Sequence, residues 1–268
     1  MRPISLFFMP HQDDEFGVFH QIEHELKAGR WVRCVFVTDG SATADPNCRD
    51  RESRAVLQQL GVADEDMLFI GRQLAIKDGQ MHQHVSAFVD WLDAFFTAHP
   101  DIHACFVPAW EGGHPDHDLI HAMVIELAAA LAIPGKIWQF PLYNGLHCPG
   151  PLFRTMSPLA ENGPVARQPI AWPNRLRYLK LCLGYPSQWR SWVGLLPFVG
   201  GHYLFSGTQP LQPVNRKRLA QRPHQGPLYY EKRGFLDWAT MSTAIEQLRE
   251  VLSRQAREKA ERPTQPEA

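Results

Sequence analysis

The sequence predicts an α/β fold: a Rossmann-like, mostly parallel sheet with helices on both faces, followed by an irregular C-terminal region. In residues 1–133, short apolar runs alternate with amphipathic stretches, which is typical of βαβ units. The composition then changes, because 14 of the 22 prolines lie in residues 134–227. We therefore expect one domain over residues 1–268, with a Rossmann-like core in 1–145 and loops and helices in 146–268.

The predicted strands are short apolar runs bounded by polar or turn residues, as expected for buried strands of a parallel sheet. In chain order they are Ile4–Met9, Cys34–Thr38, Met67–Gly71, Ala104–Val107 and Ile137–Pro141.

The predicted helices are the segments with apolar residues at helical spacing. In chain order they are Glu15–Ala28, Arg51–Leu60, Val85–Ala98, Leu119–Leu131, Asn174–Leu183 and Ala239–Arg262. Gly61 is placed to end the second of these as a left-handed cap. The last helix is expected to lead into a frayed, proline-containing tail.

Two proline-rich segments of the second half have less regular patterns. Residues 149–173 are rich in turn residues and predict loops or short strands. Trp192–Phe198 is apolar, and its simplest interpretation is a buried strand or loop. If exposed, it would form an apolar patch suited to a lipid-linked or polymeric glycan.

Charge and composition exclude several classes of protein. Lys and Arg number 27 against 28 Asp and Glu, a balance that argues against a nucleic-acid binder that depends on a basic field and against an electrostatically held membrane protein. No apolar run approaches the ~20 residues of a spanning helix, and the N-terminus does not resemble a signal peptide. The five cysteines are scattered and form no CxxC, which is typical of reduced thiols in a cytoplasmic protein.

The first chemical motif, residues 11–15 (His-Gln-Asp-Asp-Glu), follows the first predicted strand. Ligands bind at the carboxyl ends of strands in open parallel sheets, yet no glycine-rich turn is present to hold a dinucleotide. Imidazole and carboxylate groups are ordinary zinc ligands, and the spacing of His11 and Asp14 lets both reach one ion. The alternative is that the acidic residues cap the following helix.

The second motif, Glu-Gly-Gly-His-Pro-Asp-His at residues 111–117, follows the predicted strand Ala104–Val107. If both strands are parallel, the two motifs emerge at the same edge of the sheet. One His-x-x-His is weak evidence, but two such clusters at corresponding strand ends together favour a metal site.

These two motifs resemble those of the zinc-dependent de-N-acetylases of the PIG-L/LmbE type. The resemblance covers residues 4–125 and extends more weakly to about residue 190. Further matching stretches are Val35–Gly40, Arg49–Glu52 with Leu60–Val62, Phe69–Gly71 with Asp78–Gly79, and Tyr185–Gln188. Gln12 is a departure, because the family usually has proline there. We expect this change to affect loop rigidity and not the zinc ligands.

The resemblance implies a role for each matching residue. The ligands of Zn²⁺, or of another divalent metal, would be His11, Asp14 and His117. Asp13 would be the general base, and Arg49 would help to hold the substrate.

The remaining implied roles concern the oxyanion. His114, if protonated, would stabilise the oxyanion and protonate the leaving amine, and Asp116 would orient His114 and raise its pKa. His121, one turn beyond His117, is interpreted as a background residue.

The resulting hypothesis is a hydrolase that removes an N-acetyl group from a small amino-sugar conjugate of the N-acetylglucosamine type. An amidase that cleaves a thiol-sugar conjugate with the same site is a second enzyme hypothesis. A catalytically silent sugar-binding protein is the third, but such a protein has no reason to keep the base Asp13.

Overall fold

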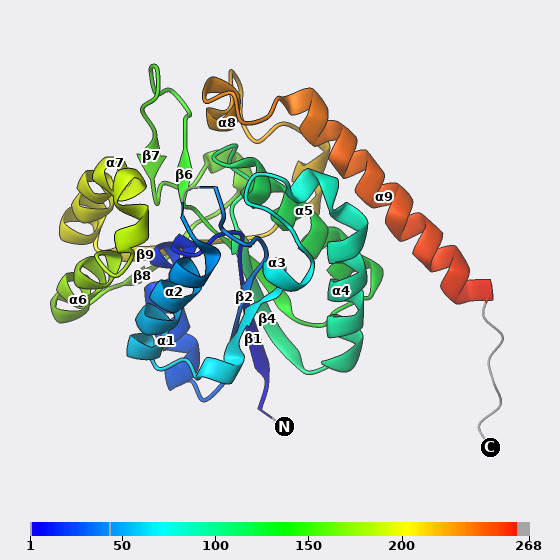
Figure 1. Cartoon of the computed structure of the whole chain (residues 1–268), viewed down its shortest axis with the longest axis horizontal. Coiled ribbons are helices and arrows are strands. Elements are labelled where there is room, and N and C mark those ends of the chain that lie inside the picture. The colour runs from blue at the N-terminus through cyan, green and yellow to red at the C-terminus, as the bar shows by residue number, and fades with distance from the viewer. Residues whose placement is uncertain (1, 43, 262–268) are drawn as a thin grey trace.

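The computed structural model of the chain describes residues 2–42 and 44–261. Across these residues a seven-stranded sheet has the order β3-β2-β1-β4-β5-β9-β8 (Figure 1). Its strands are β1 (Ile4–Met9), β2 (Trp31–Phe36), β3 (Met67–Phe69), β4 (Ile102–Pro108), β5 (Lys136–Phe140), β8 (Ala166–Pro169) and β9 (Thr208–Pro213). The strands β1 to β5 are parallel, whereas β9 and β8 continue the sheet in antiparallel pairings. The predicted fold class is confirmed.

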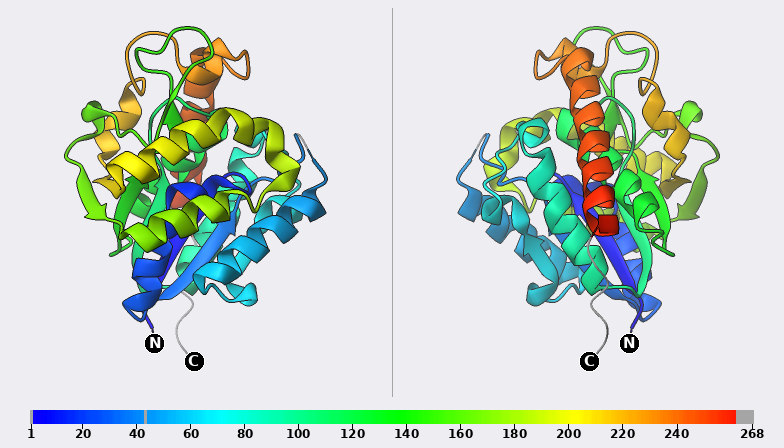
Figure 2. Two further views of the ribbon diagram at one scale, coloured as in Figure 1. Left: turned by 90° about the vertical axis from the view of Figure 1, so that its left-hand side faces the viewer. Right: turned by 90° about the vertical axis from the view of Figure 1, so that its right-hand side faces the viewer.

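Helices cover both faces of the sheet, because side chains that alternate along each strand enter two separate cores. In β1, Leu6 and Phe8 are buried in one core and Phe7 and Met9 in the other. The first core is covered by α4 (Val85–Ala98), α5 (Pro115–Ala130) and α9 (Trp238–Glu261). The second is covered by α1 (Phe19–Lys27), α2 (Pro46–Leu60), α6 (Trp172–Cys182) and α7 (Trp189–Gly201). Figure 2 shows α6 and α7 in its left view and α9 in its right view.

The strand order reverses beside β1, which pairs with β2 on one side and with β4 on the other. Such a reversal separates the two loops that leave the carboxyl ends of the paired strands and opens a crevice between them. The loops after β1 and β4 carry the two motifs. The sheet topology therefore brings them together, as the sequence predicts.

Local interactions explain where the elements near this crevice begin and end. The first predicted helix is divided into a 3₁₀ turn, Asp14–Gly17, and α1. The helix α5 begins at Pro115, four residues before its predicted start, because the His114 side chain accepts the backbone N–H of Asp116. Gly61, with φ of 97°, ends α2 as predicted.

The strand β3 is shorter than predicted. It ends at Phe69, and the chain turns into α3 (Ile70–Gln73). A Cβ atom on Gly71 would lie 2.1 Å from the carbonyl carbon of Thr38, so only glycine allows this close approach.

The second half is more regular than predicted. It contributes a hairpin of β6 (Tyr143–Asn144) and β7 (Arg154–Thr155), the helices α6 and α7, a π-helical turn at His202–Ser206, and α8 (Tyr229–Lys232). The predicted helix Ala239–Arg262 is observed as α9, while Arg262 and the expected frayed tail lie outside the described residues.

The interpretation of Trp192–Phe198 as a buried strand or loop is wrong, because this segment is part of α7. Its residues Trp192, Leu195 and Val199 recur at helical spacing and are buried against the second core. Most of the residues between them, Leu196 excepted, are exposed, so about half of this apolar helix faces outward. None of the helices in the described part of the chain is long and apolar enough to cross a membrane.

Candidate active site

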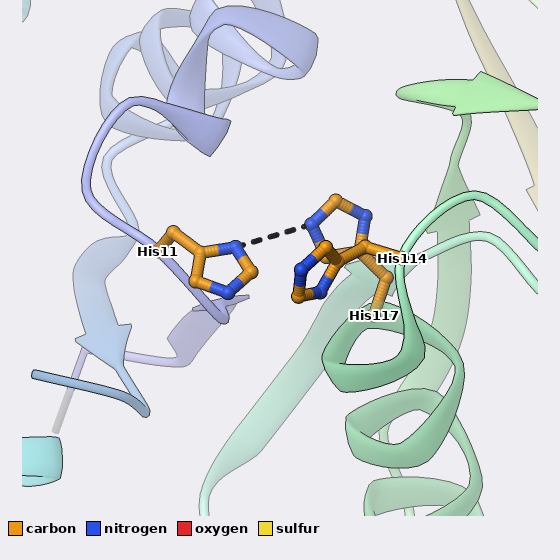
Figure 3. A group of neighbouring side chains, drawn as sticks. All are labelled: His11, His114 and His117. Atoms are coloured by element: carbon orange, nitrogen blue, oxygen red, sulfur yellow. Dashed lines mark hydrogen bonds between the residues drawn. The ribbon is translucent and has the colours of Figure 1, made fainter. Parts of the chain in front are cut away.

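The two motifs meet in one crevice at the carboxyl ends of β1 and β4. His11 lies in the loop after β1, whereas His114 and His117 come from the start of α5 and point toward it (Figure 3). One ring nitrogen from each of these three histidines lies within 4.8 Å of the other two. The structure therefore brings together residues that are more than 100 positions apart in the sequence.

The side chains of His11, Asp14 and His117 converge at the separation that a tetrahedral metal requires. The Nδ1 atom of His11 is 3.3 Å from Nε2 of His117, the contact dashed in Figure 3, and 3.2 Å from Oδ2 of Asp14. The Nε2 atom of His117 is also 3.3 Å from Oδ1 of Asp14. Ligands about 2.0–2.1 Å from a tetrahedral zinc ion are separated by about 3.3 Å. The donor set and its spacing fit the ion that the sequence predicts.

The other ring nitrogen of His11 is held by two carboxylates. Its Nε2 lies 3.1 Å from Oδ1 of Asp78 and 3.1 Å from Oδ2 of Asp116. A nitrogen between two carboxylate oxygens carries the proton, which leaves the Nδ1 lone pair directed at Asp14 and His117. Metal-binding histidines are commonly oriented in this way by a carboxylate.

The electrostatics of the cluster favour a positive charge at its centre. Burial opposes protonation of His11, but the neighbouring carboxylates, led by Asp78, raise its pKa well above the usual value. Burial likewise opposes ionisation of Asp14, but His117 and His11 hold the pKa of that carboxyl well below its usual range. A divalent cation would supply the charge that these groups favour.

Asp13 is held apart from the converging groups by an uncommon backbone conformation. Its φ of 105° is in the left-handed region, where residues other than glycine are rare and often functional. Its Oδ1 accepts a hydrogen bond from Nη2 of Arg49 at 3.1 Å, and its backbone N–H is bound by Glu15. Burial raises the pKa of Asp13 to about 8, although Arg49 opposes the rise.

The alternative that the acidic residues cap a helix is not supported here. Neither Asp13, at the start of the 3₁₀ turn, nor Val18, at the start of α1, makes a side-chain capping hydrogen bond.

Arg49 is buried and already bound by groups of the protein. It donates to the carbonyls of Gly40 (2.8 Å) and Gln12, and it contacts Asp78 Oδ2 at 3.3 Å as well as Asp13. The contacts therefore place it as a group that positions Asp13, while it also lines the cavity.

Asp116 and His114 are arranged differently from the sequence-based expectation. The Asp116 carboxylate accepts the backbone N–H groups of Gly79 and Met81 in addition to contacting His11, whereas His114 Nδ1 is 3.9 Å from it. Burial and the charge on His11 lower the pKa of His114 to about 4 and outweigh Asp116, which raises that pKa as expected, so the expected net rise is wrong. The Nδ1 atom of His114 accepts the backbone N–H of Asp116, so the neutral ring carries its proton on Nε2.

The crevice opens into a cavity of about 500 Å³ lined by His11, Asp13, Asp14, Arg49 and His114. The sequence-based prediction missed several further lining residues, which are Asp78, Tyr143, Gln188, Ser191, Leu195 and Phe235. For Asp78, the Asp-Gly pair in the family resemblance was an available signal. The others, apart from Gln188 in the weaker Tyr185–Gln188 match, belong to segments without a motif.

Two expectations near the cavity agree with the structure. The Nδ1 atom of His121 lies 2.7 Å from the Pro108 carbonyl, so this histidine belongs to the packing between α5 and β4. Gln12 is buried, and its Nε2 donates to Asp50 on α2 at 2.7 Å, which ties down the loop without using a metal-facing group.

A known protein family matches the part of the chain that contains both motifs. Residues 6–128 match the family described as PIG-L, GlcNAc-PI de-N-acetylase, so the resemblance seen in the sequence is confirmed over this stretch. No curated protein matches the chain.

Several solved structures share the fold at low identity. The A40926 pseudoaglycone deacetylase is 18% identical (TM-score 0.55, 80% of this chain and 98% of that chain). The zinc-inhibited form of teicoplanin deacetylase is 16% identical (TM-score 0.56, 79% of this chain and 98% of that chain). The N,N′-diacetylchitobiose deacetylase from Pyrococcus horikoshii is 16% identical (TM-score 0.53, 80% of this chain and 83% of that chain).

Proposed function

We propose that this PIG-L-type chain is a zinc-dependent hydrolase that removes the N-acetyl group from an amino-sugar conjugate. One observation carries the proposal. Donor atoms of His11, Asp14 and His117 lie 3.2–3.3 Å apart beside a cavity into which Asp13 and His114 also face. Such a site offers three protein ligands, an adjacent base and an oxyanion donor, which are the parts needed for metal-assisted amide hydrolysis.

Zinc bound to these three ligands would lower the pKa of a water molecule and polarise the amide carbonyl. Asp78 and Asp116 would hold His11 in the tautomer that presents Nδ1 as a ligand. Asp14, whose pKa is depressed, would remain ionised across the working range.

Asp13 is the proposed general base. Its carboxylate would take a proton from water as the water oxygen bonds to the acetyl carbon. When the C–N bond breaks, the same proton would pass to the amine, giving a free amino sugar and acetic acid, which then loses its own proton to become acetate. A base with a pKa near the working pH is effective in both steps, and burial gives Asp13 that property.

His114 is the proposed oxyanion donor. Because its Nδ1 accepts the Asp116 N–H, the Nε2–H of the neutral ring is free to donate to the carbonyl oxygen as negative charge develops there. This role does not require the protonated imidazole that the sequence alone suggested.

An amino-sugar substrate is supported by the family description and by the solved relatives. The matched family is named for GlcNAc-PI, and the related structures include a diacetylchitobiose deacetylase, an A40926 pseudoaglycone deacetylase and a teicoplanin deacetylase. A cavity of about 500 Å³ has room for one sugar ring and part of its conjugate.

The test is release of acetate from a panel of N-acetylglucosamine glycosides and phosphoglycans, measured in parallel with cleavage of thiol-sugar amides. We expect acetate from at least one N-acetyl sugar, and no release by Asp13→Asn. Cleavage confined to the thiol-sugar amides would favour an amidase. Zinc-loaded protein that cleaves nothing in the panel would favour a silent sugar-binding protein.

The cytoplasm remains the proposed location. All five cysteines are described, and all are free thiols. Unpaired cysteines are typical of a reducing compartment.

A further inference from the structure

The exposed large apolar side chains of the described residues are concentrated on α6, on α7 and on the π-helical turn that follows α7. Val193 is 67% exposed, Trp189 59% and Phe205 88%. Monomeric proteins rarely expose contiguous apolar surface without a functional reason. This region is therefore a candidate interaction surface.

The exposed residues of α6 and its C-terminal end form one stripe. Trp172, Leu176 and Leu183 are spaced i, i+4 and i+11, so they share a face of the helix. Tyr178 and Leu181, on the opposite side, are buried in the second core.

The helix α7 repeats this arrangement. Trp189 and Val193, four residues apart, are exposed, whereas Trp192 and Leu195 are buried. Figure 2 (left) shows α6 and α7 lying side by side across one side of the molecule. We call the exposed stripes of α6 and α7, with Phe205, the apolar face.

The helices α6 and α7 and the turn after them carry an excess of cations. Residues 172–206 contain four Lys and Arg and no Asp or Glu, in a chain whose net charge is −1. One of the four, Arg177, pairs with Glu23. Arg175 and Arg190 lie over the rings of Trp172 and Trp189, within 5.5 Å of the ring centroids. Within the described residues, no carboxylate forms an ion pair with Arg190 or with the exposed Lys180. The apolar face is thus bordered by cations that are available to a partner.

We propose that the apolar face binds the surface of an anionic lipid bilayer, with α6 and α7 lying in the plane of the interface. Helices that carry Trp, Leu and Phe on one side together with Lys and Arg bind membranes in this way. Anionic lipid headgroups would pair with the unpaired cations. A second copy of the chain fits less well, because a two-fold interface would bring like charges together.

The apolar face is continuous with the rim of the active-site cavity. Ser191 and Leu195 of α7 line that cavity, and Phe153, next to the exposed Leu152, contacts Phe198 of α7. A bilayer on the apolar face would therefore lie beside the cavity mouth. This proposal goes beyond the proposed hydrolase activity and does not depend on it.

The test is co-sedimentation of the full chain with vesicles of phosphatidylcholine alone and of phosphatidylcholine mixed equally with phosphatidylglycerol. We expect binding to the anionic vesicles that weakens with salt. The double variant Val193→Asp/Phe205→Asp is expected to bind at least about tenfold less. Its matched control, Ser253→Asp/Ala256→Asp, adds the same charges to exposed positions of α9 and should bind within about twofold of the unaltered chain.

A second pair of variants isolates the cations. Arg190→Gln is expected to weaken binding to anionic vesicles about fivefold, and Arg257→Gln on α9 to have little effect. Circular dichroism checks that each variant is folded. Equal affinity for both vesicle types, no binding to either, or an equal loss in the α9 controls would overturn the proposal. A stable dimer in sedimentation velocity that Val193→Asp/Phe205→Asp dissociates would show that the apolar face is a contact between copies. None of these readouts requires turnover, so this proposal can fail while the hydrolase stands.

Discussion

The crevice beside β1 and the apolar face of α6 and α7 depart from the usual burial rule in opposite directions. The crevice buries His11, Asp14 and Asp116, whereas the apolar face exposes Trp189 and Phe205 to solvent. Buried charges and exposed aromatic side chains both cost free energy in an isolated chain. The comparison teaches that a ligand would offset the free-energy cost of each region. The ligand would be a cation in the crevice and a lipid surface on the apolar face.

The largest expected effect is that of removing the metal from the crevice. A chelator is expected to lower acetate release at least about a thousandfold, and added Zn²⁺ to restore it. The fold should remain, because both hydrophobic cores lie outside the metal-binding residues. Circular dichroism and metal analysis check this. Undiminished turnover by metal-free protein would contradict a catalytic role for the ion.

The next largest effect is expected from substituting two tryptophans of α7, one on the buried side of the helix and one on its exposed side. Trp192 packs against Phe16 and Tyr185, so Trp192→Ala is expected to lower the free energy of unfolding by about 3–5 kcal/mol. Trp189 is exposed, and Trp189→Ala should change the free energy of unfolding by less than about 0.5 kcal/mol. Urea unfolding measures both. Similar losses in the two variants would mean that the apolar face is packed against the protein.

A smaller effect is expected at Arg49, on the pH dependence of catalysis. The Arg49 guanidinium lowers the pKa of Asp13, so in Arg49→Gln that pKa should rise further. The base acts when deprotonated, and the rising limb of kcat/KM should therefore move about one unit to higher pH. Arg49→Lys, which keeps the charge, serves as the control. An unmoved limb with a raised KM would instead support the substrate-holding role that the family resemblance implies.

Most of the core, and the convergence of the two motifs at one edge of the sheet, could be predicted from the sequence. The strand β1 and the helix α4 have the predicted bounds, because each has a pattern that depends only on its own residues. His11, Asp14 and His117 lie together because each directly follows a strand or begins a helix at one edge of the sheet. Their assignment as metal ligands comes from the family resemblance and stays a prediction.

Residues whose role depends on tertiary contacts could not be predicted in the same way. Asp116 was expected to orient His114, but it contacts His11, a choice set by how α5 docks on the loop after β1. The segment Trp192–Phe198 of α7 resembles a buried strand or loop in sequence because its apolar residues are nearly continuous. Periodicity alone cannot distinguish such a run from a helix that is apolar on two sides.

The adjacent residues Asp13 and Asp14 offer the most direct test of the account, because the same substitution should have different effects on them. Metal content and acetate release are measured together for Asp13→Asn and Asp14→Asn. We expect Asp13→Asn to keep its zinc while turnover falls about a thousandfold, and Asp14→Asn to lose the zinc as well as the activity. Loss of zinc from Asp13→Asn, or a full complement of zinc in Asp14→Asn, would contradict the assignment of base and ligand.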